Sequence, residues 1–412
     1  MKMVLKPVLA ALVTAGLATG GANAQSNPDF KFSGFGTLGY VHSSEEGADF
    51  VGTLFQPNGA GHTKSWAYGV DSKLGAQADV RFNDSFSGVL QLVSQHNPDN
   101  TYTPKVEWAN VKFQATPELS LRLGRIAAPS FLVSDSRFVG YAQPWVRPPV
   151  EVYGVIPITS NDGIDASYRK QFSSFTNTVQ AYYGVATATL ETGKVKSTGG
   201  WGINDSVQMG DVTLRAGYSA NKLDLKLPGI STLLGGVAAF GAIPGPVGAQ
   251  AKALRQKYDD QNLKTSSYTM AVSYDPGQWF AMAEYVGFKG AGILADSNSW
   301  YVTGGYRFGS FTPYATYATT KSKVANEAGI PFAAAAPINA GLNNALNNQF
   351  NGTQTTTSAG LRWDFFKNTA VKLQYDHVNL GAGSAGRLSH PLPTMVRGGS
   401  FNLTSVALDF VF

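Results

Sequence analysis

The feature that most constrains this chain is a period-two alternation of apolar and polar residues, in segments of about ten residues. Near the C-terminus, apolar residues fall on one face of an extended segment and smaller or polar ones on the other: Val406, Leu408, Phe410 and Phe412 against Ser405, Ala407 and Asp409. A longer segment of the same kind opens with Trp66 and closes with Phe82. A strand of a soluble sandwich also alternates, but it seldom runs so long with aromatic residues at both ends. In lipid every backbone polar group must be paired, so a membrane-spanning sheet must close. The alternation therefore predicts an all-β fold, a transmembrane antiparallel β-barrel.

The connections between the alternating segments give an independent test. Sixteen strands are predicted, near 30–43, 66–82, 85–95, 104–115, 119–126, 164–171, 176–189, 201–209, 211–220, 265–274, 279–288, 298–308, 311–320, 355–365, 369–378 and 400–412. Short connections with turn residues, such as Asn83-Asp84 and Asp275-Pro276-Gly277, alternate with long ones. Outer-membrane barrels have this asymmetry, with short periplasmic turns and long outer loops. A barrel of 12 or 18 strands remains the structural alternative.

The N-terminus and the composition bound the class of protein. Residues 1–24 read as a cleaved signal peptide, with Lys2 and Lys6, an apolar stretch and an Ala22-Asn23-Ala24 site, which leaves 25–412 as the barrel. Without that segment the formal charge is about 30 − 27 = +3, with no basic tract for nucleic acid. Cysteine is absent, and the five histidines show no metal-ligand spacing. We expect no metal and no cofactor.

Several segments carry a family resemblance. They are the first strand, Phe30–Gly36 (FKFSGFG), a late hairpin of Gly360–Phe365 (GLRWDF) with Val371–His377 (VKLQYDH), and the terminal Phe412. With the strand count, they make the chain resemble the Gram-negative trimeric 16-stranded porins over its whole mature length. The resemblance implies an outer-membrane location, a homotrimer surrounded by outer-membrane lipid, and passive diffusion of small hydrophilic solutes.

The longest connection of the first half, 127–163, follows the fifth strand. In the porins, the loop at this place folds into the barrel and narrows the pore, so the resemblance implies the same for 127–163. The general enterobacterial porins carry a Pro-Glu-Phe-Gly-Gly-Asp type motif there. This chain has instead Ser134–Gly140 (SDSRFVG) and Trp145–Glu151 (WVRPPVE). The chemistry of the constriction does not carry over, and a substrate-selective channel stays open as an alternative.

Alternation also nominates the side chains that face the lumen. Ten basic and six acidic strand positions are expected inside: Lys31, Lys73, Arg81, Lys112, Arg122, Arg169, Arg215, Arg307, Arg362 and Lys372 against Asp71, Asp79, Asp165, Glu284, Asp364 and Asp376. The expected constriction comprises Arg122, Arg125, Asp135, Arg137, Arg147, Asp165 and Arg169. Rings of charge set pore selectivity, so the excess of basic residues predicts a weak preference for anions. For any single residue, an ordinary solvated lumen charge is an equal alternative.

Two other functions are weighed against a pore. An outer-membrane barrel enzyme of the lipase or protease type needs a nucleophile beside a base, and only His377 is a tempting base in a chain without a G-x-S-x-G motif. We therefore expect no enzyme. An adhesive barrel with a plugged lumen is disfavoured by the lumen charges, because unpaired buried charge is costly. Two Ala/Gly-rich stretches, 229–254 and 329–347, are expected to be flexible outer loops, with short helices as the alternative.

Overall fold

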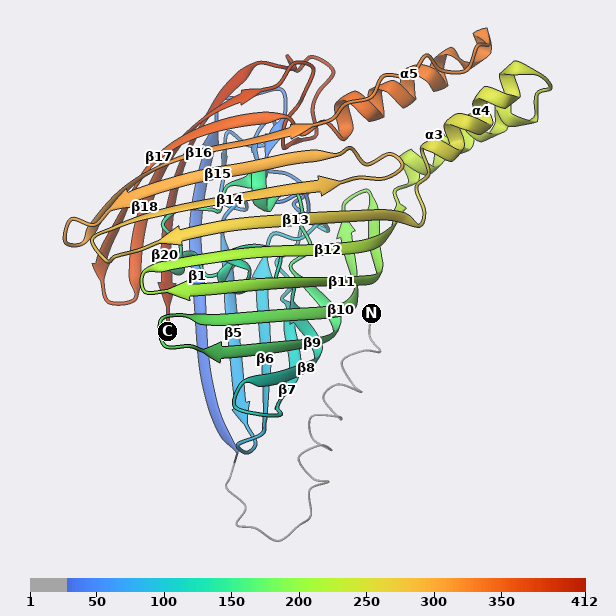
Figure 1. The fold of residues 1–412 in the computed structure, drawn as a ribbon. Helices are drawn as coiled ribbons and strands as arrows, with labels where there is room; N and C mark the ends of the chain where they lie inside the picture. The colour runs from blue at the N-terminus through green and yellow to red at the C-terminus, as the bar shows by residue number, and fades with distance from the viewer. Residues whose placement is uncertain (1–27) are drawn as a thin grey trace.

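The computed structural model describes residues 28–412, except the side chain of Gln349, so the expected signal peptide 1–24 lies outside the described residues. The chain forms one closed antiparallel barrel (Figure 1). The sheet contains seventeen strands, one of which, β4 (Trp66–Ala67), is a two-residue segment between β1 and β5, so sixteen strands make up the wall. β1 closes it by pairing with β20 on one side and β5 on the other. The predicted barrel of sixteen strands is confirmed.

The strand bounds follow the alternating segments closely. They are β1 Asp29–Ser43, β5 Lys73–Arg81, β6 Phe86–Gln95, β7 Lys105–Gln114, β8 Leu119–Ala127, β9 Ser160–Gln171, β10 Thr176–Leu190, β11 Gly193–Met209, β12 Val212–Lys226, β13 Leu263–Tyr274, β14 Trp279–Lys289, β15 Ser297–Tyr306, β16 Phe311–Ser322, β17 Gln354–Phe366, β18 Thr369–Leu380 and β20 Ser400–Val411. Short turns join them at one end of the barrel and most of the long connections lie at the other.

The two faces of the wall are inverted relative to a soluble protein. Leu123, Ile164 and Tyr183 stand side by side on three adjacent strands and are 65 %, 54 % and 57 % exposed. On the inner face Thr37 and Asp409 are completely buried. Apolar side chains outside and polar ones inside suit a wall that faces lipid on one side and a hydrated interior on the other.

Two boundaries differ from the sequence expectation. The segment 66–82 is interrupted, because residues 68–72 turn between β4 and β5. The connection expected at 190–200 is only two residues long, since β10 and β11 continue to Leu190 and Gly193. A register shift between Thr198 and Trp201 explains the miss: Gly199 adopts a φ of +61° at this bulge, so a glycine pair that resembles a loop lies inside a strand.

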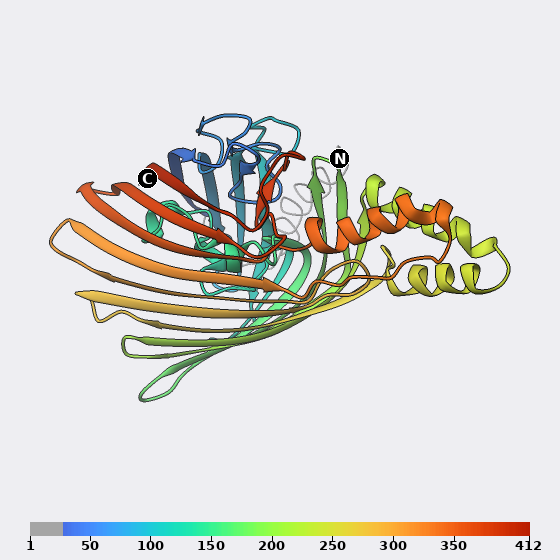
Figure 2. The same ribbon diagram turned by 90° about the horizontal axis from the view of Figure 1, so that it is seen from above.

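The two Ala/Gly-rich stretches are helical. Helices α3 (Pro228–Ala239) and α4 (Pro246–Lys257) follow β12, and α5 (Ala336–Asn344) follows β16, with short turns at Phe240–Ala242, Ala333–Ala335 and Ala345–Gln349. Leu234, Leu254 and Leu342 pack together in the core of this helical lobe. The lobe projects beyond the strand ends on the long-loop side (Figures 1 and 2). The expectation of flexible loops was wrong here, because buried leucines tie the two stretches together. No helix among residues 28–412 is long and apolar enough to cross a membrane.

A small second sheet joins the first and last long connections. It consists of β2 (Asp49–Phe50), β3 (Ala60–Gly61) and β19 (Leu388–Ser389). Phe50 of β2 is buried in a cluster with Leu403 of β20. The first and last long connections are therefore fixed to each other at one side of the barrel mouth.

Candidate functional site: the loop inside the barrel

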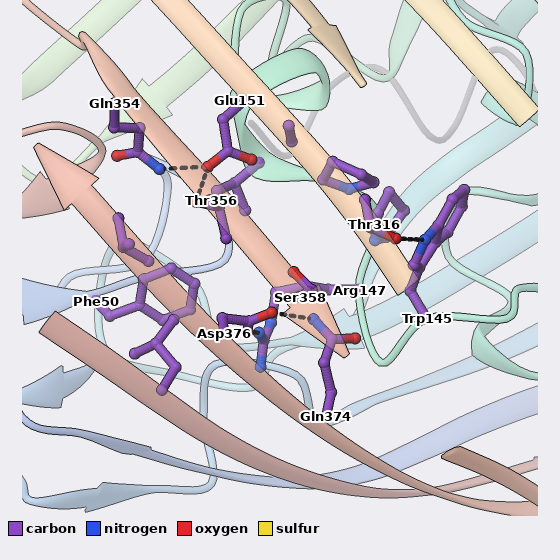
Figure 3. A pocket seen from close by; sticks show the side chains of 16 residues that line it. Phe50, Trp145, Arg147, Glu151, Thr316, Gln354, Thr356, Ser358, Gln374 and Asp376 are labelled. Carbon is purple, nitrogen blue, oxygen red and sulfur yellow. Dashed lines mark hydrogen bonds and ion pairs between the residues drawn. The ribbon is translucent and has the colours of Figure 1, made fainter. Parts of the chain in front are cut away.

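Residues 128–159 leave β8, cross the interior and return to β9. Two single-turn 3₁₀ helices and α2 lie within them: Ser134–Ser136, Gly140–Ala142 and Val150–Tyr153. Trp145 reaches the opposite wall, where its Nε1 donates to the hydroxyls of Thr303 on β15 and Thr316 on β16, both at 3.0 Å. The indole is 1 % exposed, and Figure 3 shows its nitrogen directed at Thr316. We call residues 128–159 the inner loop.

Arg147 is the main charged anchor of the inner loop. Its guanidinium donates to both carboxylate oxygens of Asp71, at 2.6 and 2.8 Å, and to Ser405 at 2.7 Å. Nη1 lies 3.3 Å from a carboxylate oxygen of Asp376 on β18 (Figure 3). The ring of Phe50 covers the guanidinium, with its centroid 5.1 Å away. Buried charge is tolerated only when it is paired and hydrogen-bonded. These contacts therefore use Arg147 to hold the inner loop in place, and its guanidinium is not free to bind a passing solute.

Lys372 of β18 is a second anchor, whose ammonium group lies against two carbonyls and one carboxylate. Nζ lies 2.7 Å from the carbonyl of Gly140, 2.8 Å from that of Trp145 and 2.8 Å from Oδ2 of Asp409. The other oxygen of Asp409 accepts a hydrogen bond from Thr37 at 2.5 Å. A lysine expected to line the lumen therefore serves the backbone of the inner loop, and it is completely buried.

Arg362 and Gln374 add further contacts between the inner loop and the wall. Arg362 donates to the carbonyls of Tyr141 and Gln143, at 2.6 and 3.0 Å. The Gln374 carbonyl accepts from the backbone N–H of Val146 at 3.0 Å. Together with Lys372, these side chains satisfy inner-loop backbone groups that a segment without sheet partners would otherwise leave unpaired.

Two buried carboxylates hold the other part of the inner loop. Glu151 of α2 accepts hydrogen bonds from Gln354, at 2.6 Å, and from Thr356 (Figure 3). Burial raises the pKa of Glu151. On β14, Glu284 accepts from the N–H of Leu132 and the hydroxyl of Tyr153, both at 3.0 Å. Both carboxylates are at most 2 % exposed.

Behind the inner loop, little space remains. The cavity between Arg147, Glu151 and the wall of β16 to β18 measures about 30 Å³, which is room for about two water molecules (Figure 3). On this side, the loop and the wall pack together through the polar contacts described above and through apolar side chains such as Phe50, Val378 and Leu403.

The opposite side of the inner loop faces β8 to β12, where the charges are more accessible. Arg122 and Asp165 form a bidentate pair across β8 and β9, and the arginine side chain is 28 % exposed. Arg169 is exposed further along β9, toward the short-turn end, where its backbone N–H donates to the carbonyl of Glu118 at 2.8 Å. Arg215 of β12 donates to the carbonyl of Pro129 at 2.7 Å. Asp135 of the inner loop is close enough to Arg122 and Arg215 for its charge to act on both.

The structure therefore divides the expected site residues. Asp135, Arg122, Asp165, Arg169 and Arg215 lie on the accessible side, as described above. Arg137 and Arg147 belong to the inner loop, but both are turned into contacts with protein: Arg137 donates to the carbonyls of Tyr153 and Ile156, at 2.8 and 3.4 Å. Burial lowers the pKa of Arg137.

Several expectations need correction. Glu284 and Lys372 were expected to line open lumen, but both are buried against the inner loop. Arg125 was expected in the constriction, but it pairs with Asp162 at 2.7 Å. These two residues continue the outward-facing row of Leu123 and Ile164, because side chains alternate along adjacent strands.

Two other lumen candidates sit at the short-turn end of the barrel. Arg81 pairs with Asp84, and both side chains are largely exposed. Arg307 pairs with Asp275 at 2.7 Å and donates to the carbonyl of Gly277. Their strands end there, so these arginines are fixed to turns. Lys73 is half-buried on β5, near Asp71.

Four residues that hold the inner loop were not singled out by sequence: Trp145, Glu151, Gln374 and Asp409. Alternation places Gln374 and Asp409 on the inner face, which is a usable signal. No local signal identifies Trp145, whose hydrogen-bond partners lie 158 and 171 residues away. Among residues 28–412, no group of His, Asp or Glu side chains is arranged to hold a metal ion.

Comparison with known proteins agrees with this geometry. The family model described as Gram-negative porin matches residues 9–387. A search of curated protein sequences finds no match to the chain. Among solved structures, the trimer form of OmpT, an outer membrane protein of Vibrio cholerae, is 14 % identical, with 94 % of this chain and 100 % of that chain covered and a TM-score of 0.55.

Two further solved structures are similar over the same extent. OmpF of Salmonella typhi in complex with daunomycin is 14 % identical, with 93 % and 97 % of the chains covered and a TM-score of 0.55. The anion-selective porin from Comamonas acidovorans is 13 % identical, with 94 % and 100 % covered and a TM-score of 0.53. At these sequence identities, the structural similarity supports a shared fold and nothing more. With the family match over most of its length, the chain belongs to the Gram-negative porins, the channel-forming β-barrels of the outer membrane.

Proposed function

We propose that this porin conducts small hydrophilic solutes through the gap between the inner loop and the wall of β8 to β12, with a weak preference for anions. The carrying observation is the charge of that gap. Arg122, Arg169 and Arg215 contribute three positive charges, and Asp165, which pairs with Arg122, contributes one negative charge. Asp135 is the acidic group on the facing inner loop. A ring with more accessible guanidinium than carboxylate favours anions.

The closed side of the inner loop supports this path. Between the loop and β14 to β18, buried side chains such as Trp145, Lys372 and Glu284 occupy the interior. A solute that entered there would have to break buried ion pairs, which costs several kcal/mol for each pair. The side of β8 to β12 requires no such rupture.

The test is single-channel conductance in a planar bilayer, with the reversal potential measured under a salt gradient. We expect stepwise openings and a reversal potential biased toward anions. A cation bias would leave a porin but refute the charge assignment. Strong block of the current by one solute class would indicate a substrate-selective channel. Absence of conductance from a folded barrel would favour a plugged, adhesive barrel.

We also propose a homotrimer in which the wall around β8 and β9 faces another subunit and the rest of the outer face contacts lipid. The supporting observation is the outward-facing Arg125–Asp162 pair, with side chains 36 % and 48 % exposed. The pair lies near the long-loop ends of β8 and β9, where a subunit interface would offer it polar partners. Native mass spectrometry of the extracted protein should give three chains per particle, and Arg125→Leu with Asp162→Leu should shift it toward monomer.

No catalytic activity is proposed. His377, the base considered from sequence, lies 2.8 Å from the side chain of Asn402 on the neighbouring strand, and no serine is among its hydrogen-bond partners in the described part of the chain. A lipid-hydrolysis assay should show no turnover above buffer. Turnover that His377→Ala abolishes would establish an enzyme instead.

A further inference from the structure

The tip of the β10–β11 hairpin contacts the last long connection, residues 381–399, across the mouth of the barrel. Nε2 of His390 lies 2.7 Å from a carboxylate oxygen of Glu191, which is 199 positions away in the sequence. In the order of the wall, six strands separate the hairpin from the last connection in one direction, β12 to β17, and six in the other, β1 and β5 to β9. The contact therefore joins opposite sides of the mouth.

The hairpin leaves the curve of the wall before it reaches this contact. β9 pairs with β10 only as far as Val185, whereas β10 continues to Leu190. At the same level, Gly199 and Gly200 form a bulge between β11 and both of its neighbours. A bulge bends its strand, and in Figure 1 the light green end of the hairpin stands at an angle to the rest of β10 and β11. The contact with His390 gives the direction of the bend, over the mouth.

The last long connection is held at the mouth by the residues that precede His390. Ser389 of β19 pairs with Asp49 of β2, and the Arg387 guanidinium donates to the carbonyl of Gly154 in the inner loop at 3.3 Å. His390 follows directly and has a φ of +50°, a left-handed conformation that histidine adopts more readily than β-branched residues do. His390 therefore projects from a segment that rests on the small second sheet and on the inner loop.

The contact lies at the entrance to the proposed conduction path. β10 and β11 are in the middle of the wall of β8 to β12, and Glu191 is at their long-loop end. Both side chains of the contact are about half-exposed. Contacts between exposed charged groups contribute little stability, so this one opens and closes readily. The hairpin and the last connection are thus joined by a weak and reversible bridge.

We propose that Glu191 and His390 form a bar across the entrance that limits the size of the solutes that reach the gap. While the bar is closed, the hairpin and the last connection together narrow the entrance, and only small solutes pass beside them. Larger solutes enter when the contact breaks. The bar acts on the proposed conduction path and therefore rests on that proposed function, but it selects by size, whereas Arg122 and Arg215 act on charge.

The first test compares the entry of neutral sugars into liposomes that contain the folded protein, measured by swelling. A mono-, a di- and a trisaccharide differ in size but carry no charge, so the ion preference does not affect the result. E191A with H390A should speed entry of the trisaccharide, relative to the monosaccharide, by about threefold, the change in population that an exposed ion pair can produce. The matched control is E46A with H62A, which removes the same two residue types from exposed positions of the first long connection.

The second test locks the bar. Because the chain contains no cysteine, E191C with H390C can be joined specifically by a flexible bis-methanethiosulfonate cross-linker, and a reductant removes the link again. We expect efficient cross-linking within one chain, slower trisaccharide entry while the link is present, and recovery after reduction. Each protein sample is its own control, so altered folding of the variant does not affect the comparison.

The outcomes separate the bar from the pore itself. If the unaltered protein admits no sugar, the proposed function fails and the bar fails with it, even where cross-linking shows that the two positions meet. Sugar entry without cross-linking would show that the contact does not form, and cross-linking without slower trisaccharide entry would place it away from the path. Either result overturns the bar, as does equal trisaccharide entry in E191A with H390A and in the control. A reversible, size-dependent block supports it.

Discussion

Arg147 of the inner loop and Asp71 beside β5 form a two-pronged ion pair, with Nη2 2.6 Å from one carboxylate oxygen and Nε 2.8 Å from the other. Both side chains are less than a tenth exposed. The pair spans 76 residues of sequence and connects the inner loop to the wall near the barrel mouth. Removing either partner leaves a buried charge without its main counterion.

Asp71→Asn should therefore loosen the inner loop and destabilise the barrel. The expected loss in the free energy of unfolding is about 3 kcal/mol, since Arg147 keeps only Asp376 and Ser405 as partners. Denaturant titration of the folded protein measures the loss, and current noise in the open channel reports the loop. Asp84→Asn is the matched control, because its pair with Arg81 is exposed and should matter by less than about 1 kcal/mol. Equal effects of the two substitutions would contradict the anchoring role.

Gly140 tests how closely the inner loop meets the wall. A Cβ at this position would lie 2.1 Å from an oxygen of Asp409 and 2.6 Å from the hydroxyl of Thr37. Gly140→Ala should push the loop away and cost about 1–3 kcal/mol, with a change in single-channel conductance. Gly235→Ala, on the exposed face of α3, meets no atom within 4 Å and should be neutral or slightly stabilising. Wild-type conductance and stability for Gly140→Ala would show that the loop does not seat there.

The fold was predictable because lipid imposes a rule on every residue of a strand. Alternation is local, so Leu121 and Leu123 identify the outer face of β8 without knowledge of any contact. The prediction failed where the local signal was ambiguous. Gly199 and Gly200 resemble a loop but form a bulge within β11, and the leucines of the lobe resemble loop residues until their partners are known.

The site was predictable only in part. The direction of a side chain follows from alternation along its own strand, but its hydrogen-bond partner can lie far away in the sequence. Alternation along the strands placed Lys372 and Arg362 inside the barrel. It could not indicate that their partners are carbonyl groups of the inner loop more than 200 residues away. A charge that binds the loop and a charge that binds a solute have the same sequence pattern. The distinction arises only when 128–159 is seated against β14 to β18.

The ion preference should respond in opposite directions to two substitutions at the gap. Arg215→Gln removes a positive charge from β12 and should move the reversal potential toward cations. Asp135→Asn removes the negative charge of the inner loop and should move it toward anions. We expect the anion-to-cation permeability ratio to change by a factor of about two in each case. Arg81→Gln, at the short-turn end, serves as a control of equal charge. Shifts of the same sign for both substitutions would exclude the proposed path.

Glu151 should make the stability of the inner loop dependent on pH. Burial raises the pKa of this carboxyl above its ordinary value of 4.5, so the folded protein holds the proton more tightly than the unfolded chain. Stability is then highest at low pH and falls as pH rises from about 4.5 through the raised pKa of the folded state. Glu151→Gln keeps an oxygen for Gln354 and Thr356 but cannot ionise.

The substituted protein should therefore lose less stability than the wild type over this pH range, and at neutral pH it should be at least as stable. The unfolding midpoint in denaturant, measured at several pH values, checks this. Glu118→Gln is a suitable control, because Glu118 is exposed in a turn and should leave the wild-type pH profile intact. A profile for Glu151→Gln that follows the wild type at every pH would mean that Glu151 ionises as readily in the folded as in the unfolded protein. The polar interface of α2 with β17 would then admit enough water to solvate a carboxylate, and the closed side of the inner loop would have to be reconsidered as a route for ions.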